Sequence, residues 1–350
     1  MEELIKRGIS FLRKIKPDDR ILLVYHKDLD GLSSGLIFSK CMKKLGLKVE
    51  RKCASSNEEI EKIAKKVKNF DKIIVLDIDI SYMKEKLLRF KKDILIIDHH
   101  PPRKNLNAKR IVYINPRIKN PKIYQPASYV TYKFFSKILN TESEKWLAII
   151  GTISDFGFSD CKDLLKGLKI KSKEDIPKTR VWKEVEKLVG IISEIGFEKT
   201  FRLLERTSSL EEFKKNEAVR KALKKYLKKI KDCEKIFWKN LKEYKEVNLL
   251  ISEIETKHRE ITSLISTKMS GKFPEKVLVV FRKVGKKYAI HARYRGSLEI
   301  DLGKIMERSA KGLNGGGGHP HAAGASIKEE NREIFERRLI RELGRFFGKK

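Results

Sequence analysis

The sequence has little that would support a disulfide scaffold, a thiolate metal site or a membrane span. It contains four cysteines in 350 residues, and none of them forms a CxxC pair, so neither a disulfide framework nor a zinc knuckle is indicated. No apolar run approaches the ~20 residues that a membrane helix requires. The N-terminal residues MEELIK lack the uninterrupted apolar stretch of a signal peptide. We therefore expect a soluble, cytoplasmic protein with no membrane partner.

Negative charge is scarce relative to positive charge. Asp and Glu number 47 against 80 Lys and Arg, which gives a formal net charge of +33. A field of that size attracts polyanions and makes their association salt-dependent. The alternative is the Lys-rich surface of a thermophilic protein, because Gln occurs once, at Gln125, and Lys far outnumbers Arg. Thermophiles usually enrich Glu alongside Lys, so the imbalance favours a nucleic-acid partner.

Short apolar runs alternate with helical patterns over the first 100 residues. The apolar runs that predict strands are Ile21–His26, Lys48–Ala54, Ile73–Asp77 and Ile94–Asp98. Helical spacing separates them, and two further helices are expected over 128–140 and 143–153. This alternation predicts βαβ units, and therefore an α/β fold with a parallel sheet covered by helices on both faces.

Strand patterns disappear between about residues 162 and 244, where Lys and Glu dominate. Apolar residues recur there at steps of three, four or seven: Val219, Leu223, Leu227, Ile230, Phe237, Leu241 and Tyr244. Such a stripe predicts one long helix, either a partner-binding coiled coil or a connector packed within its own chain. Strand-like alternation returns after residue 245. We therefore expect three parts: a domain at 1–165, a helical connector at 166–244 and a smaller α+β domain at 245–350.

Side chains that can bind metals stand at the ends of three predicted strands. The first strand ends in His26-Lys27-Asp28-Leu29-Asp30, the second in Asp77 and the third in Asp98-His99-His100. A later helix ends at Asp155. Taken singly, each motif could be a turn or a helix cap. Jointly they are unusual, because ligands of parallel sheets bind at the carboxyl ends of the strands.

These residue types determine which ions would fit. Carboxylates with one or two imidazoles and no thiolate suit manganese or magnesium, and the histidines favour Mn²⁺. Two such ions about 3.5–4 Å apart can clamp a phosphate and make a bound water nucleophilic. Without metal, the converging carboxylates would repel one another and some would hold protons. Asp77, on the central strand, is best placed to bridge the two ions.

These motifs resemble those of a known superfamily at both ends of the chain. His26-x-Asp28-x-Asp30-Gly31, the strand-end Asp77, Asp98-His99-His100 and Asp155 resemble the four motifs of the DHH phosphoesterases. The run from Gly315 to Gly324, GGGGHPHAAG, is similar to the glycine-rich signature of the DHHA1 substrate domain. The order and spacing also match. The resemblance implies a catalytic DHH domain at 1–165 and a substrate-binding DHHA1 domain at 245–350.

The resemblance also implies a role for each matching residue in the first domain. One ion would be held by His26, Asp28 and Asp77. The other would be held by Asp30, Asp77, His99 and Asp155. The two ions would be Mn²⁺, with Mg²⁺ as the alternative. Asp98 would orient the motif's histidines by hydrogen bonding, and His100 would donate to the phosphoryl oxygen instead of binding metal.

In the second domain the expected ligand is substrate phosphate. Glycine backbone can approach a phosphate closely and point N–H groups at it, which is the role expected of Gly315, Gly316, Gly317 and Gly318. By resemblance, His319 and Arg293 would grip the phosphate. Arg295 is a weaker candidate that strand alternation places on the same face as Arg293.

Within the superfamily the sequence is most similar to the compact archaeal type of RecJ-like exonuclease. This resemblance implies release of mononucleotides from single-stranded DNA or RNA by attack of a metal-bound hydroxide. The charge of +33, the segment Gly151–Asp155 and the Lys-rich connector favour this reading. Larger bacterial RecJ proteins carry further domains, whereas this sequence ends just after its DHHA1-like region, so the resemblance does not imply processivity or a tight grip on a polymer.

Two alternatives remain open. One is a nanoRNase-type enzyme that acts on very short oligonucleotides or on a 3′-phosphoadenosine nucleotide, although such an enzyme gains little from so basic a surface. The other is a replisome-associated protein that binds replication proteins such as GINS and retains residual nuclease activity. Loss of metal ligands usually marks the non-catalytic relatives, and here every ligand position is filled. The motifs do not specify strand polarity or a preference for DNA or RNA.

Overall fold

The chain folds into two compact units. A computed structural model describes residues 2–347 and separates them between Ala222 and Leu223. The segment 166–244, predicted as a connector, contributes to both units: α7 to α9 belong to the first, and α10 crosses the boundary. The division into three domains therefore remains a prediction.

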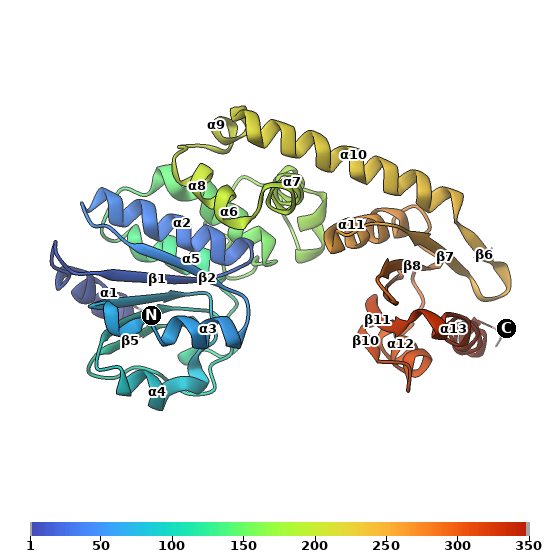
Figure 1. Cartoon of the computed structure of the whole chain (residues 1–350), viewed down its shortest axis with the longest axis horizontal. Coiled ribbons are helices and arrows are strands. Elements are labelled where there is room, and N and C mark those ends of the chain that lie inside the picture. Colours follow the sequence, from blue (N-terminus) through green and yellow to red (C-terminus); the bar gives the residue numbers. More distant parts are fainter. Residues whose placement is uncertain (1, 348–350) are drawn as a thin grey trace. The chain divides into compact units, whose positions relative to one another are not determined.

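The first unit is built on a five-stranded sheet in the order β2-β1-β3-β4-β5, with every pair parallel (Figure 1). Its strands are β1 (Ile21–His26), β2 (Glu50–Ala54), β3 (Lys72–Leu76), β4 (Asp93–Ile97) and β5 (Ile111–Ile114). Its helices are α1 (Glu2–Arg13), α2 (Leu29–Lys44), α3 (Asn57–Ala64), α4 (Lys84–Arg89), α5 (Ala127–Phe135), α6 (Lys145–Ser154), α7 (Arg180–Ile195), α8 (Phe197–Glu205) and α9 (Leu210–Lys215). The predicted parallel α/β fold is confirmed.

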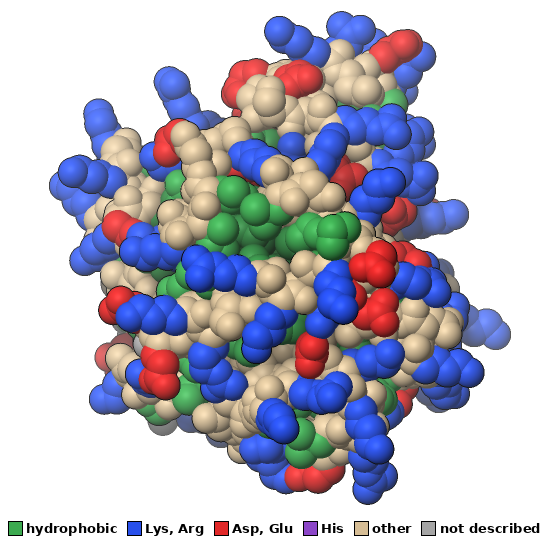
Figure 2. All heavy atoms as spheres, turned by 90° about the vertical axis from the view of Figure 1, so that its left-hand side faces the viewer, with side chains coloured by type: hydrophobic (Ala, Val, Ile, Leu, Met, Phe, Trp, Pro, Cys, Tyr) green, Lys and Arg blue, Asp and Glu red, His purple; other side chains and the backbone are tan. Residues whose placement is uncertain are grey.

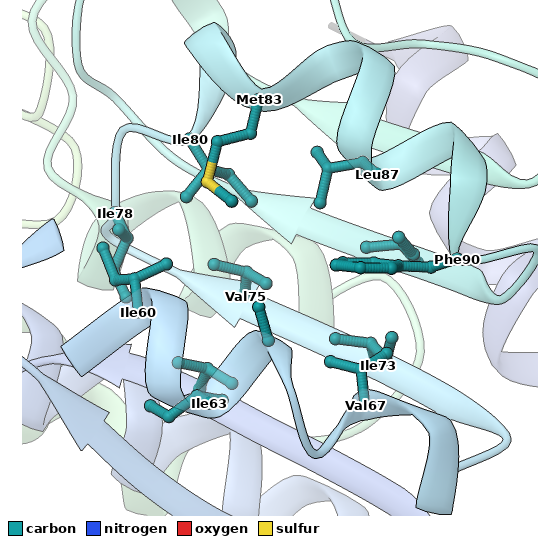
Figure 3. Close-up of a pocket in the computed structure, with 13 residues that line it drawn as sticks. Ile60, Ile63, Val67, Ile73, Val75, Ile78, Ile80, Met83, Leu87 and Phe90 are labelled. Atoms are coloured by element: carbon teal, nitrogen blue, oxygen red, sulfur yellow. The ribbon is translucent and has the colours of Figure 1, made fainter. Parts of the chain in front are cut away.

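Helices cover both faces of this sheet, as the unbroken apolar runs of its strands require. Helices α1, α2 and α5 pack on one face, and α3 and α4 lie on the other (Figure 1). The first five residues of β1 are consequently all buried. On the α3 and α4 side, the layers enclose an entirely apolar pocket between Ile63, Val75, Met83 and Phe90 (Figure 3). This pocket is part of the hydrophobic core and carries no polar side chain that could react.

The long helix α10 (Glu217–Lys239) forms as predicted but ends earlier than the apolar stripe suggested. Its buried residues include Val219, Ala222, Tyr226 and Phe237, whereas Leu227 is exposed. Residues 242–244 form the edge strand β6. The buried face of α10 therefore matches the predicted stripe at Val219 and Phe237, whereas Tyr226 takes the buried position that was predicted for Leu227.

The second unit contains a six-stranded mixed sheet in the order β10-β11-β9-β8-β7-β6. Its strands are β6 (Lys242–Tyr244), β7 (Leu249–Ile254), β8 (Val277–Val284), β9 (Lys287–Arg293), β10 (Gly316–His319) and β11 (Ala322–Lys328). Its helices are α11 (Arg259–Ser270), α12 (Leu302–Ala310) and α13 (Arg332–Phe347). Only β7 and β8 pair in parallel, and α11 connects them. Helix α11 packs on one face, while α12 and α13 cover the other.

The surface is basic over a wide area. Figure 2 shows Lys and Arg side chains spread across one whole face, with Asp and Glu interspersed among them. Positive charge on this face is therefore not confined to a single stripe. Among the described residues, no helix combines the length and the apolarity needed to cross a membrane.

Candidate metal centre and glycine-rich motif

Metal-capable side chains from three neighbouring strands meet at one edge of the parallel sheet. His26 ends β1, Asp77 follows β3 and Asp98 follows β4, and these strands are adjacent in the order β1-β3-β4. Because all three run in the same direction, their carboxyl ends open at the same edge. Sheet topology thus gathers residues that lie more than 70 positions apart in the sequence.

A first candidate ligand group consists of His26, Asp28 and Asp77, whose ligand atoms all lie within 4.8 Å of one another. His26 Nδ1 is 2.7 Å from Asp28 Oδ2 and 3.8 Å from Asp77 Oδ2. The hydrogen bond with Asp28 raises the pKa of His26. Burial by itself raises the pKa of Asp28, but the hydrogen bond with His26 and that from the Gly31 N–H outweigh it and lower the pKa.

The second group consists of Asp30, His99 and Asp155. His99 Nε2 lies 3.9 Å from Asp30 Oδ2 and 3.6 Å from Asp155 Oδ2. It also lies 3.2 Å from Asp77 Oδ1, so Asp77 contacts both groups. Burial lowers the pKa of His99. The lowered pKa favours the neutral imidazole, which is the form that binds metal.

Asp77 stands between the two groups. Its side chain is 2% exposed, and its Oδ2 is buried without a hydrogen-bond partner among the described residues. Burial, together with the charges of Asp30, Asp28, Asp98 and Asp155, raises its pKa well above the usual value. Its φ of 60° lies in the left-handed region, which Asp and Asn tolerate better than most residues. A buried carboxylate with an unpaired oxygen and acidic neighbours is suited to a divalent cation.

Asp30 is fixed by the start of α5. Its carboxylate accepts hydrogen bonds from the backbone N–H groups of Ala127, at 2.6 Å, and Ser128, at 3.0 Å. Burial and the charge of Asp155 nevertheless raise the pKa of Asp30 to about 7. The close approach of α2 to β1 depends on Gly31, because a Cβ there would lie 2.2 Å from the carbonyl oxygen of His26.

Asp98 belongs to none of the candidate ligand groups, and its carboxylate holds His100. His100 Nδ1 lies 2.8 Å from Asp98 Oδ1, and this hydrogen bond raises the pKa of His100. The Tyr113 hydroxyl donates to Asp98 Oδ2 at 3.2 Å, and Asn115 donates to the His100 carbonyl at 2.9 Å. His100 also forms a metal-capable group with Asp77 and His99. Its assignment as a phosphoryl donor therefore stays a prediction.

Sequence reasoning missed Tyr113, Asn115 and Tyr124. Tyr113 and Asn115 belong to the run IVYIN at 111–115, which repeats the pattern of an apolar strand that ends in a polar residue. That pattern could have identified β5. The Tyr124 hydroxyl donates to Asp155 Oδ2 at 2.5 Å, and its ring lies edge-on to His99. No spacing rule links Tyr124 to Asp155, because the contact depends on the path of a loop.

The glycine run of the second unit forms a strand instead of a loop. Gly316 to His319 make up β10, which pairs antiparallel with β11 and places Gly317 opposite Gly324. Gly318 has a φ of 141°, and a Cβ there would lie 2.6 Å from the Ala323 Cα. Gly318 and His319 are both exposed. The backbone at Gly318 and His319 is thus accessible, and the binding of a phosphate there stays a prediction.

The two predicted arginines lie in different surroundings. Arg293 is the last residue of β9, and its side chain lines a pocket beside α11. Arg295 lies beyond the end of the strand, so strand alternation does not place the two together. It donates to Ser270 Oγ at 3.0 Å and to the Thr267 carbonyl at 3.3 Å, both at the end of α11. These hydrogen bonds tie the Arg295 side chain to the end of α11 within the second unit.

Comparison with known families gives two matches. Residues 20–153 match the DHH family, N-terminal domain, and residues 246–345 match the DHHA1 domain. Together the two models cover more than half of the chain. No curated protein matches the sequence significantly.

Several solved structures share the fold. RecJ from Thermus thermophilus in complex with Mn²⁺ has 16% identity and a TM-score of 0.64, with 98% of this chain and 55% of that one covered. The chain thus spans about half the length of that protein. An exonuclease RecJ bound to manganese has 17% identity and a TM-score of 0.62, with coverage of 98% and 94%. The pGpG-specific phosphodiesterase PggH from Vibrio has 14% identity and a TM-score of 0.54, with coverage of 93% and 99%.

Proposed function

Since the chain belongs to the DHH/DHHA1 phosphoesterase superfamily, we propose that it is a metal-dependent phosphodiesterase that removes mononucleotides from the end of single-stranded DNA or RNA. The observation that carries this proposal is the position of Asp77. Its two carboxylate oxygens face different ligand groups, with Oδ1 3.2 Å from His99 Nε2 and Oδ2 3.8 Å from His26 Nδ1. A carboxylate that contacts both groups can serve as the bridge of a two-metal site.

The donor set supports manganese, with magnesium as the alternative. His26, Asp28 and Asp77 would hold one ion, and Asp30, Asp77, His99 and Asp155 would hold the other. When bound, such a pair of ions clamps a phosphate and lowers the pKa of water. The oxygen-rich set with two imidazoles and no thiolate matches the preference of Mn²⁺.

His100 is proposed to act on the substrate directly. Its Nδ1 is engaged by Asp98, which raises the pKa of His100 and so favours the charged imidazolium. The remaining Nε2–H can then donate to a phosphoryl oxygen, where a positive donor stabilises the charge that develops during hydrolysis. Asp98 keeps the imidazole oriented, and Tyr113 in turn fixes Asp98.

A single-stranded polymer fits the electrostatics better than a short oligonucleotide. The net charge of +33 and the spread of Lys and Arg over the surface (Figure 2) favour a long polyanion. The likeness of the fold to PggH makes a very short substrate the second candidate. Binding to replication proteins such as GINS would add to catalysis and not replace it, because every proposed ligand position carries a side chain that can bind metal.

Digestion of end-labelled strands tests this function. DNA and RNA of about 3 and 30 nucleotides would be incubated with the protein and Mn²⁺, with excess chelator as the control. We expect stepwise shortening of the 30-mer with release of mononucleotides, and no cleavage in chelator. Strands labelled at the 5′ end and at the 3′ end would be compared, because the label that is retained longest lies at the end opposite to the one where digestion starts. Cleavage of the 3-mer alone would support the short-oligonucleotide alternative, and full activity in chelator would refute a metal-dependent reaction.

A further inference from the structure

A pocket beside α11 in the second unit is lined by basic side chains. Arg259 and Ser263 reach it from α11, Arg282 from β8, and His291 and Arg293 from β9. Residues 289–290 of β9 and 323–325 of β11 complete the lining, and none of the lining residues is acidic. Arg259 and Arg282 belong to no motif that the sequence singled out.

Strand register explains why these residues share one face of the sheet. Arg282 is paired with Ala289, and His291 is paired with Val280 on one side and with Gly324 on the other. Residues directly opposite each other point to the same face. Because Ala289 and Gly324 have little or no side chain, space remains above the sheet between the basic groups.

Arg282 is largely buried, and part of its guanidinium is unpaired. It is 8% exposed, and its Nε has no hydrogen-bond partner among the described residues. Burial and the charge of Arg259 lower its pKa, and the charge of Glu260 opposes this shift only in part. The nearby Glu260 is already 3.1 Å from His258 Nδ1. Burial, followed by the charges of Arg293, Arg259 and Arg282, also lowers the pKa of His291 to about 4.

Such an arrangement is unfavourable for the free protein. A largely buried charge with an unpaired donor costs stability, and a methionine at position 282 would fill the space without that cost. Residues that destabilise a fold in this way are typical of binding sites. A phosphate group would supply both the negative charge and the acceptor oxygens that the arginines lack.

We propose that this pocket binds a phosphate group, with Arg282 and Arg259 as its principal ligands. We assign this phosphate group to the backbone of the single-stranded substrate, and this assignment rests on the proposed function. Gly324 borders the pocket and pairs with Gly317 of the glycine-rich motif. The pocket is therefore proposed as a second phosphate subsite, which adds Arg282 and Arg259 to the one expected at Gly315–Gly318 and shares Arg293 with it.

Urea denaturation of the metal-free protein tests the site without reference to activity. Midpoints would be measured with and without inorganic phosphate at constant ionic strength. The variants are Arg282→Met, Arg259→Met at an exposed position, and the control Arg337→Met on the exposed side of α13. We expect phosphate to raise the midpoint of the wild type and the control more than that of either pocket variant. Without phosphate, Arg282→Met should unfold at the wild-type midpoint or above it.

An equal phosphate response in all four proteins would overturn the proposal. A lowered midpoint for Arg282→Met, combined with a normal phosphate response for Arg259→Met, would also overturn it, because Arg282 would then be a structural residue. Absence of nuclease activity would refute the proposed function but would not affect the conclusion that the pocket binds phosphate.

Binding of a labelled 30-mer, with Ca²⁺ in place of Mn²⁺ to prevent cleavage, identifies the source of the phosphate. If the strand supplies it, Arg282→Met should weaken binding by about 10- to 100-fold, as expected for lost hydrogen bonds to a charged group. The log–log salt slope should fall by about 0.7 per lost phosphate contact. A lost phosphate response with unchanged strand binding would support a free phosphate monoester as the ligand and reject the strand.

Discussion

Replacing Asp77 with Asn should abolish most activity while leaving the metal-free fold intact. Asn has nearly the same shape as Asp and also tolerates the left-handed φ of 60° at this position. The substitution therefore removes the charge without straining the backbone. Because Asp77 contacts both ligand groups, both ions should lose a ligand at once.

The expected loss of activity can be bounded from the structure. Removing a group that only orients a metal ligand typically costs 10–100-fold in metal affinity or activity, and removing a ligand should cost at least as much. With two ions affected, activity at limiting Mn²⁺ should fall by about 10²- to 10⁴-fold. Stability should change in the opposite sense. Burial and the four neighbouring aspartates disfavour the charge of Asp77, so the metal-free variant should be as stable as the wild type or more stable.

The matched control is Asp79→Asn. Asp79 lies two residues further along, and its carboxylate accepts hydrogen bonds from the backbone and hydroxyl of Ser81. It belongs to neither candidate ligand group. Nuclease rates across a Mn²⁺ titration and urea unfolding in chelator would be compared for the three proteins. Near-normal turnover of Asp77→Asn would refute the assignment of Asp77 as the carboxylate that bridges the two ions. A loss of more than about 1 kcal/mol of unfolding free energy in Asp77→Asn, a typical effect of a destabilising mutation, would refute the claim that charge repulsion at Asp77 destabilises the metal-free protein.

Three further predictions concern the substrate motif, pH and salt. His319→Ala should weaken substrate binding but leave metal stoichiometry unchanged, which equilibrium dialysis with Mn²⁺ would check. The pKa of Asp30 is about 7 in the fold and near 3.9 when unfolded, so the metal-free fold binds the extra proton. The unfolding free energy of the metal-free protein should therefore fall as pH rises from 4 to 7, by up to about 1.4 kcal/mol per pH unit from Asp30. Urea unfolding curves measured in chelator across this pH range check the prediction, and an unfolding free energy that rises with pH would contradict it. Affinity for a 30-mer should fall with salt at about −0.7 per neutralised phosphate and more steeply than for a 5-mer; equal shallow slopes would favour the short-oligonucleotide alternative.

The strand-end residues could be predicted because they depend on topology alone. Once alternating strands and helices indicated a parallel sheet, Asp77 and Asp98 had to meet at one edge. Contacts made through loops and surface strands were harder to foresee. Tyr124 reaches Asp155 through a loop whose path the sequence does not encode locally, and the run at Gly316 forms a strand because it pairs with β11.

Side-chain environment was the least predictable level. Periodicity placed Leu227 in the stripe of α10, but Tyr226 occupies the buried position. Arg282 directly follows the apolar run at 277–281, and nothing in the local sequence indicates that it is buried. Its burial follows from tertiary packing, which places α11 beside β8 and β9.

Anomalous diffraction from crystals of the protein grown with Mn²⁺ tests the central claim most directly. The account predicts two manganese peaks about 3.5–4 Å apart at the carboxyl edge of the parallel sheet, with the Asp77 carboxylate between them. His26 and Asp28 should contact one peak, and His99 and Asp155 the other. A single peak, or two peaks that do not share Asp77, would contradict the two-metal site on which the proposed phosphodiesterase activity rests.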